Sequence, residues 1–287
     1  MIKIFTKPIL FLFYNIFIAN IIKSSYSYDI NVAETAVWLS GAAYCGKDNY
    51  TSMKLAGPAS NFIVENVLYD KKTDLEGYTG VLISTNSIYV VFRGSFSDRN
   101  WIDDFEILKT KYHTFSECDC KVHRGFYQAT LNLKNSTINS VNFLKKKYGY
   151  SNVIVTGHSL GAAIAQMMGM ELVAVNISNI IYNYGQPRVG DKDYARFVNS
   201  ILEQQLKLYR FTHDKDIIPH VPPLDIGYVH SCREIFENIN GTLKNCSLEN
   251  CEDQTCANQF PLIDTNIKEH MYYLKHYLGC KSSTVHV

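Results

Sequence analysis

The second half of the chain alternates between apolar runs typical of strands and apolar periodicities typical of helices. Runs rich in β-branched and aromatic residues predict strands at residues 153–156, 177–185 and 206–211. Apolar side chains at helical spacing predict helices at residues 125–149, 160–173 and 190–204. This alternation predicts an α/β fold with a mostly parallel central sheet covered by helices.

The first third of the chain predicts one helix and then three strands. Residues 31–45 have apolar positions at helical spacing, and Asn31 with Glu34 resembles a capping box at its start. Three β-rich runs separated by turn residues follow at residues 61–69, 78–85 and 87–94. We expect these strands to extend the sheet in antiparallel fashion.

Residues 238–260 are polar and rich in cysteine, and they lack any periodicity. They predict a long loop tied by disulfides. No internal repeat and no Pro- or Gly-rich linker divides the chain, so we expect one domain after the leader.

Residues 1–27 have the pattern of a secretory signal peptide. Lysines precede an apolar run at residues 9–22, and Ser25 and Ser27 occupy the −3 and −1 positions of a cleavage site. The alternative is an uncleaved membrane anchor, although the run is short for a membrane span. We expect a secreted protein with its folded domain in residues 28–287.

Composition narrows the possible partners. The chain has 287 residues, of which 46% are hydrophobic, enough for a sizeable core. The net charge is +1, so no excess of either sign indicates a nucleic-acid partner. We expect a monomer that does not bind nucleic acid.

The cysteine count agrees with secretion. An even number of cysteines predicts four disulfides in a secreted chain, and the eight are Cys45, Cys118, Cys120, Cys232, Cys246, Cys251, Cys256 and Cys280. Spacing alone leaves the pairing open. A zinc site is disfavoured because the late cysteines lack the usual CxxC spacing. N-glycosylation sequons, which matter only on the secretory route, occur at Asn49, Asn135, Asn176, Asn240 and Asn245.

The segment Gly157-His158-Ser159-Leu160-Gly161 lies between a predicted strand and a predicted helix. Such a turn is either an ordinary connection or an elbow that presents a nucleophilic serine. Glycines at the first and last positions suit a crowded elbow, where a Cβ would clash. The helix that begins at Leu160 would direct its positive end at an oxyanion. G-x-S-x-G also occurs by chance, but the flanking strand and helix favour the nucleophile.

A nucleophilic serine needs a histidine and an acid, which follow in that fold in the order serine, acid, histidine. The acid should lie just past the C-terminal end of a strand. The predicted strand 206–211 therefore favours Asp214 or Asp216 over Asp191, Asp193 and Asp225. Spacing cannot choose among the downstream histidines, which are His220, His230, His270, His276 and His286.

Several stretches together make the chain resemble the class 3 lipases, a secreted fungal triacylglycerol lipase family with the α/β-hydrolase fold. The resemblance covers residues 33–279, and its matching stretches are VVFRGSFSDRNWIDDF, VHRGFYQA, VTGHSLGAAIA, NYGQPRVGD, THDKDIIPHVPP and EHMYYL. This set is far more specific than one pentapeptide.

The resemblance implies a role for each matching residue. It places the nucleophile on Ser159, the acid on Asp216 and the histidine on His270. It places the oxyanion donors on Ser95 and on the backbone N–H of Leu160. No metal or other cofactor is implied, because N–H groups can hold the oxyanion.

The resemblance also implies a lid at residues 95–105, with an apolar face made by Phe96, Trp101, Ile102 and Phe105. Such a segment could cover the site in water and open at a lipid surface. From residue pattern alone, an amphipathic surface turn is the alternative.

Two disulfides are implied by the resemblance, Cys45 to Cys280 and Cys246 to Cys256. The region of Cys118 and Cys120 matches a family position that carries a disulfide. Cys232 and Cys251 remain as a further pair. The cysteine-rich segment departs from the compact fungal lipases, so the shape of the acyl or alcohol groove is open.

Three hypotheses for function follow. The first is a secreted lipase that cleaves acylglycerols at a lipid interface, with transient contact to a membrane or lipid droplet. The second is an esterase with the same triad acting on soluble or feruloyl-type esters, or a phospholipid-directed lipase. The third is a binding protein with a vestigial site.

Overall fold

The computed structural model describes residues 27–95, 107–201, 206–280 and 285–286. The α-helices are α2 (Ile30–Ala42), α4 (Arg124–Tyr148), α5 (Leu160–Ala174) and α6 (Lys192–Ile201). The central sheet contains β2 (Phe62–Asp70), β3 (Leu75–Leu82), β4 (Ser87–Phe92), β7 (Asn152–His158), β8 (Asn179–Tyr184), β9 (Leu206–His213), β10 (Glu234–Glu237) and β11 (Leu243–Asn245). Short strands pair outside it as β1 (Lys54–Leu55) with β14 (Val285–His286), β5 (Lys109–Lys111) with β6 (Lys121–His123), and β12 (Tyr272–Tyr273) with β13 (His276–Tyr277).

The eight strands of the sheet follow the order β11-β10-β9-β8-β7-β4-β3-β2. Five neighbouring strands of this sheet are parallel, namely β4, β7, β8, β9 and β10. The strands β2 and β3 add to one edge in antiparallel fashion, as predicted. At the other edge β11 pairs antiparallel with β10. The expectation of a strandless loop at residues 238–260 was therefore wrong for β11, which is too short and polar to show an alternation.

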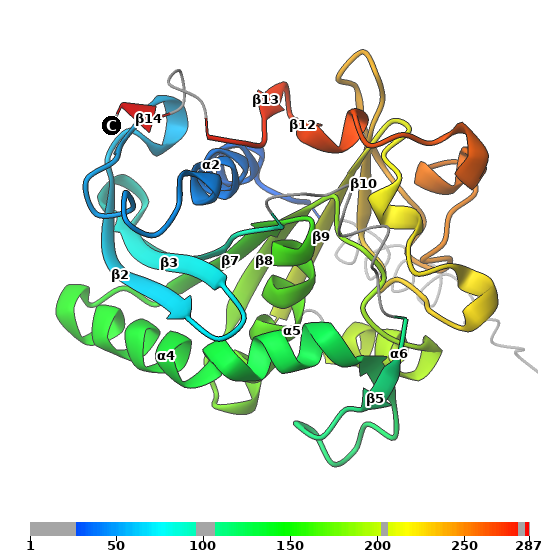
Figure 1. The fold of residues 1–287 in the computed structure, drawn as a ribbon, viewed down its shortest axis with the longest axis horizontal. Helices are drawn as coiled ribbons and strands as arrows, with labels where there is room; N and C mark the ends of the chain where they lie inside the picture. Colours follow the sequence, from blue (N-terminus) through cyan, green and yellow to red (C-terminus); the bar gives the residue numbers. More distant parts are fainter. Residues whose placement is uncertain (1–26, 96–106, 202–205, 281–284, 287) are drawn as a thin grey trace, which may run out of the picture.

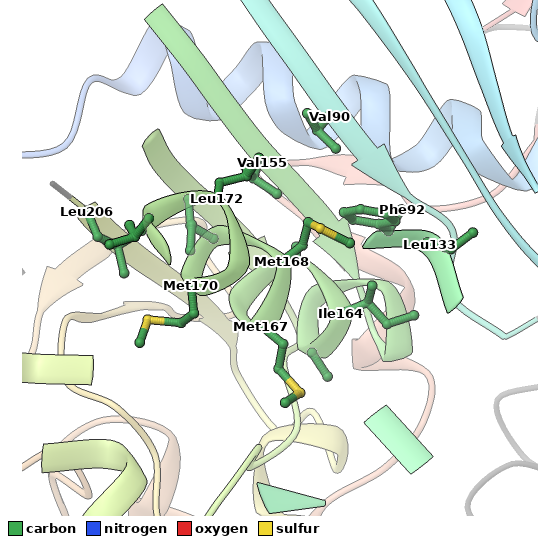
Figure 2. Packing of buried hydrophobic residues seen from close by; sticks show 14 of the residues in the cluster. Val90, Phe92, Leu133, Val155, Ile164, Met167, Met168, Met170, Leu172 and Leu206 are labelled. Atoms are coloured by element: carbon green, nitrogen blue, oxygen red, sulfur yellow. The ribbon is translucent and has the colours of Figure 1, made fainter. Parts of the chain in front are cut away.

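Helices cover both faces of the sheet. In Figure 1, α2 lies on one face, while α4, α5 and α6 lie on the other. Strand residues alternate between the two sides, so Val90 and Val155 pack against α4 and α5 while Val91 and Ile154 pack against α2. Figure 2 shows how the apolar side chains of α5 fill the space below these strands. The predicted α/β architecture is confirmed.

One local expectation was wrong. The cap of α2 is Asp29, whose carboxylate accepts from the Asn31 N–H, so Asn31 and Glu34 do not form a capping box. The start of the helix is shifted by two residues, which a weak local signal cannot exclude.

All eight cysteines are paired. The bonds join Cys45 to Cys280, Cys118 to Cys120, Cys232 to Cys251, and Cys246 to Cys256. The first connects the end of the α2 region to the last segment of the domain. The second lies in the β5–β6 connection, directly before β6. The third ties the loop after β11 to the segment before β10, and the fourth closes that loop on itself.

The expected signal peptide or anchor, at residues 1–27, lies almost entirely outside the described residues. Across the helices that the structure does describe, none has the length and apolar character needed to cross a bilayer.

Candidate active site

Ser159 occupies a sharp turn between β7 and α5. Its backbone has φ 59° and ψ −129°, a conformation that side-chain-bearing residues rarely adopt. Strain of this kind costs about 1–3 kcal/mol and persists where the surroundings enforce it. A Cβ on Gly157 would lie 2.3 Å from the backbone C and O of Gly161, and one on Gly161 would lie 2.3 Å from the Phe92 carbonyl oxygen. The two glycines therefore let the backbone close into the elbow.

We expect Gly157→Ala to destabilise the fold by about 3 kcal/mol or more, because the added methyl meets backbone that cannot move aside. Gly169→Ala, in the same helix–strand layer, is the control. Its Cβ would meet Ile181 Cδ1 and Asn179 Oδ1, which are ends of side chains and not backbone, so its loss of stability should be smaller. Urea unfolding measures both. Equal stability of Gly157→Ala and the wild type would contradict the crowded elbow.

Asp216 and His270 form a buried pair beside the elbow. His270 Nδ1 lies 2.8 Å from Asp216 Oδ2, and both side chains are at most 1% exposed. Asp216 follows the end of β9, and His270 lies in the short 3-10 helix η8 (Glu269–Met271). The Asp216 carboxylate also accepts from the Ile218 N–H at 2.8 Å and from the Tyr273 hydroxyl. Burial raises the pKa of Tyr273 well above its usual value, so this hydroxyl stays protonated as a donor.

The backbone at the end of β8 connects this pair to Ser159. The Ser159 N–H donates to the Tyr184 carbonyl at 3.1 Å. A Cβ on the next residue, Gly185, would lie 2.7 Å from His270 Nδ1 and 3.0 Å from Asp216 Oδ2. The structure therefore brings Ser159, Asp216 and His270 to one place.

His158, next to the elbow serine, holds the His270 backbone. Its Nε2–H donates to the His270 carbonyl at 2.8 Å, and its Nδ1 accepts from the Tyr44 hydroxyl at 2.6 Å. The rings of His158 and His270 are 4.1 Å apart. Burial, and then the neighbouring His270, lower the pKa of His158 well below its usual value. A neutral imidazole with this tautomer satisfies both contacts.

The expected oxyanion donors, Ser95 and the backbone N–H of Leu160, belong to segments that lie beside the Ser159 elbow. Gly94, which precedes Ser95, is so close that a Cβ there would lie 3.1 Å from Ser159 Cβ. Arg93, before it, is held by an ion pair of 2.6 Å with the buried Glu76. Leu160 is the first residue of α5, where an N–H has no acceptor within the helix. The expected lid residues Phe96, Trp101, Ile102 and Phe105 lie outside the described residues.

Three of the other candidates make their contacts away from this pair. The Asp191 carboxylate accepts from the Tyr194 N–H at the start of α6. His230 donates from Nε2 to the Pro219 carbonyl, and His276 stacks on Trp38 with ring centroids 4.4 Å apart.

Sequence reasoning missed two partners of the site, Tyr273 and Tyr44. Tyr273 stands three residues after His270 in the stretch EHMYYL, so its position was visible in the sequence. No sequence signal connects Tyr44 to His158, because 114 residues separate them.

No donor set for a metal is evident among the described residues. The one cluster of metal-ligand side chains there is Glu234 with Cys246 and Cys256. These two cysteines are bonded to each other, so neither offers the thiolate that a metal would need.

The sheet order, the strained serine elbow and the Asp216–His270 pair after β9 are the features of the α/β-hydrolase class of proteins. A sequence profile of the lipase (class 3) family matches residues 89–226. The chain belongs to the class 3 lipase family, as the sequence resemblance predicted.

Individual relatives agree with this assignment. A protein named lipase from Rhizomucor miehei is 35% identical over 197 residues, which are 66% of this chain and 52% of that protein. The chain thus spans about half the length of that relative. Secreted mono- and diacylglycerol lipase A of Penicillium cyclopium is 27% identical over 238 residues, 80% of this chain and 74% of that protein. The structure of Rhizomucor miehei triacylglyceride lipase superposes with a TM-score of 0.78 at 28% identity, covering 87% of this chain and 96% of that one.

Proposed function

We propose that this protein hydrolyses acylglycerol esters through an acyl-enzyme on Ser159. The observation that carries the proposal is the buried Asp216–His270 pair at the serine elbow. The names of two relatives, a mono- and diacylglycerol lipase and a triacylglyceride lipase, support the choice of ester.

The proposed reaction assigns one step to each group. His270 takes the Ser159 proton as Oγ attacks the ester carbonyl, and Asp216 stabilises the imidazolium. The Leu160 N–H and Ser95 hold the oxyanion of the tetrahedral intermediate. His270 then returns the proton to the leaving alcohol. A water molecule, activated in the same way, releases the fatty acid from Ser159.

We also propose that the protein is a secreted monomer that works at a lipid surface. The segment 95–105 would act as the lid, with its apolar face made by Phe96, Trp101, Ile102 and Phe105. Exposed apolar side chains in the loops beside the site support this proposal. In the short helix η7 (Leu262–Asp264), Leu262 is 47% and Ile263 is 91% exposed.

Helix η7 lies close to the acid. Two residues after it, the Asn266 N–H donates to the Lys215 carbonyl, and the Asn266 carbonyl accepts from Ile217. Asp216 stands between these two partners and pairs with Asn266 in an isolated bridge. An apolar tip at this place would enter the lipid phase beside the reacting ester.

A Leu262→Ser/Ile263→Ser variant tests this arrangement. Removing two apolar side chains is expected to weaken binding to phosphatidylcholine vesicles about tenfold or more. The rate on emulsified tributyrin should fall, whereas the rate on dissolved p-nitrophenyl acetate should stay. Phe143→Ser on α4, where Phe143 is 50% exposed, is the matched control and should leave both rates unchanged.

The same assay separates a lipase from an esterase. For the wild type, we expect the rate to rise sharply when tributyrin exceeds its solubility limit. A rate that follows simple saturation through that limit, with no effect of the Leu262→Ser/Ile263→Ser change, would instead support an esterase on soluble esters.

A further inference from the structure

The segment that follows Asp216 is held by four consecutive carbonyl groups. The Pro219 carbonyl accepts from His230 Nε2 at 2.8 Å. The other three accept from Arg188, whose Nη1 donates to His220 at 2.5 Å and to Pro222 at 3.0 Å, and whose backbone N–H donates to Val221 at 2.9 Å. Each carbonyl from residue 219 to 222 thus accepts a hydrogen bond from either His230 or Arg188.

These two donors meet on one carboxylate, that of Glu252. Arg188 Nε and Nη2 each lie 2.9 Å from a different oxygen of Glu252, which makes a two-pronged ion pair. The His230 backbone N–H donates to the same carboxylate at 2.8 Å, and the Asn258 amide donates at 2.7 Å. Glu252 is therefore the shared acceptor that fixes both Arg188 and His230.

The electrostatics are consistent with a charged clamp. Burial alone would raise the pKa of Glu252, but His230 and Arg188 lower it strongly, so the carboxylate is ionised. Arg188 is 2% exposed and Glu252 is 13% exposed. A guanidinium buried without its carboxylate would be very unfavourable, so Arg188 depends on Glu252 to stay in this position.

Glu252 belongs to the cysteine-rich segment, not to the hydrolase framework. Its neighbour Cys251 is bonded to Cys232, two residues after His230. The disulfide therefore places the Glu252 carboxylate within hydrogen-bonding distance of Arg188 and of the His230 N–H.

We propose that Glu252 is a positioning residue for Asp216. It acts through Arg188 and His230 on residues 219–222, and these hold the turn in which the Ile218 N–H orients the Asp216 carboxylate. The proposal rests on the proposed function, in which Asp216 orients His270. It assigns the cysteine-rich segment a part in catalysis that no other observation gives it.

The test uses Glu252→Gln, which keeps the shape of the side chain and removes its charge. A second variant, Arg188→Lys, keeps the charge but cannot supply the paired bonds and the carbonyl bonds together. A small displacement of a catalytic group costs up to about 100-fold. We expect kcat on p-nitrophenyl acetate to fall about tenfold or more in both variants, with KM little changed. Counting sites with a fluorophosphonate corrects for unfolded protein.

A spectroscopic readout separates positioning from stability. The proton shared by His270 Nδ1 and Asp216 should give a far-downfield proton NMR signal, which we expect to broaden or disappear in both variants. Glu234→Gln is the matched control. Glu234 is buried at the same edge of the sheet, but its partners are Thr212, Arg210 and Ala257. This variant should lose stability and keep both the signal and kcat per site.

The outcomes are distinct. A wild-type kcat per site and an intact signal in either folded variant would overturn the positioning role. An equal loss in Glu234→Gln would also overturn it, because general destabilisation would then explain the effect. If the wild type itself fails to react with the fluorophosphonate, the proposed function fails instead.

Discussion

Ser159→Ala is expected to lower kcat for a dissolved ester by roughly 10⁶-fold while leaving the fold intact. Without Oγ no acyl-enzyme can form, and His270 and Asp216 have no nucleophile to serve. The rate that remains should come from the oxyanion donors and substrate binding acting on water. Alanine keeps the Cβ that the elbow already accommodates, so the strain at φ 59° is unchanged. Stopped assays on p-nitrophenyl butyrate measure the loss.

Ser40→Ala provides the control for Ser159→Ala. The Ser40 hydroxyl is also buried and bonds to Thr156 of β7 at 3.0 Å, but it lies on the α2 side of the sheet. Its loss should change stability slightly and leave kcat near the wild-type value. Substantial tributyrin hydrolysis by purified Ser159→Ala would show that another group is the nucleophile.

Asp216→Asn is expected to lower kcat by about 10⁴-fold. One oxygen of the carboxylate accepts from Ile218, which keeps the asparagine oxygen at that position. The amide NH₂ would then face His270 Nδ1 and donate to it. His270 would hold its proton on Nε2, the nitrogen that must accept the Ser159 proton. The variant should therefore fold but hold the wrong tautomer.

A pair of variants checks this reasoning. Tyr273→Phe removes a different bond to the same carboxylate and leaves the tautomer of His270 correct, so its loss of kcat should be much smaller. Asp214→Asn changes an acid two residues away that the sequence left as an alternative. A larger loss in Asp214→Asn than in Asp216→Asn would contradict the assignment of Asp216.

The sequence predicted those parts of the molecule that depend on neighbouring residues. The order of strands and helices follows from local periodicity, and the elbow follows from two glycines around Ser159. The end of the predicted strand 206–211 limited the acid to Asp214 or Asp216. The resemblance, not the spacing, selected His270 and Asp216.

Contacts between distant segments could not be predicted in this way. His270 reaches Asp216 across 54 residues, and Glu252 reaches Arg188 across 64. A partly buried glutamate in a polar, cysteine-rich segment has no periodic signal, because its position follows from a disulfide and a single ion pair. The short strand β11 escaped prediction for a similar reason, since it gains its structure by pairing with β10.

The most direct test of the account is the site of covalent capture. The wild type, Ser159→Ala and Asp216→Asn are each treated with a p-nitrophenyl alkylphosphonate, which mimics the tetrahedral intermediate, and the peptides are analysed by mass spectrometry. The account predicts one adduct, on Ser159, formed rapidly in the wild type, slowly in Asp216→Asn and not at all in Ser159→Ala. An adduct on another residue, or an active wild type that forms none, would contradict it.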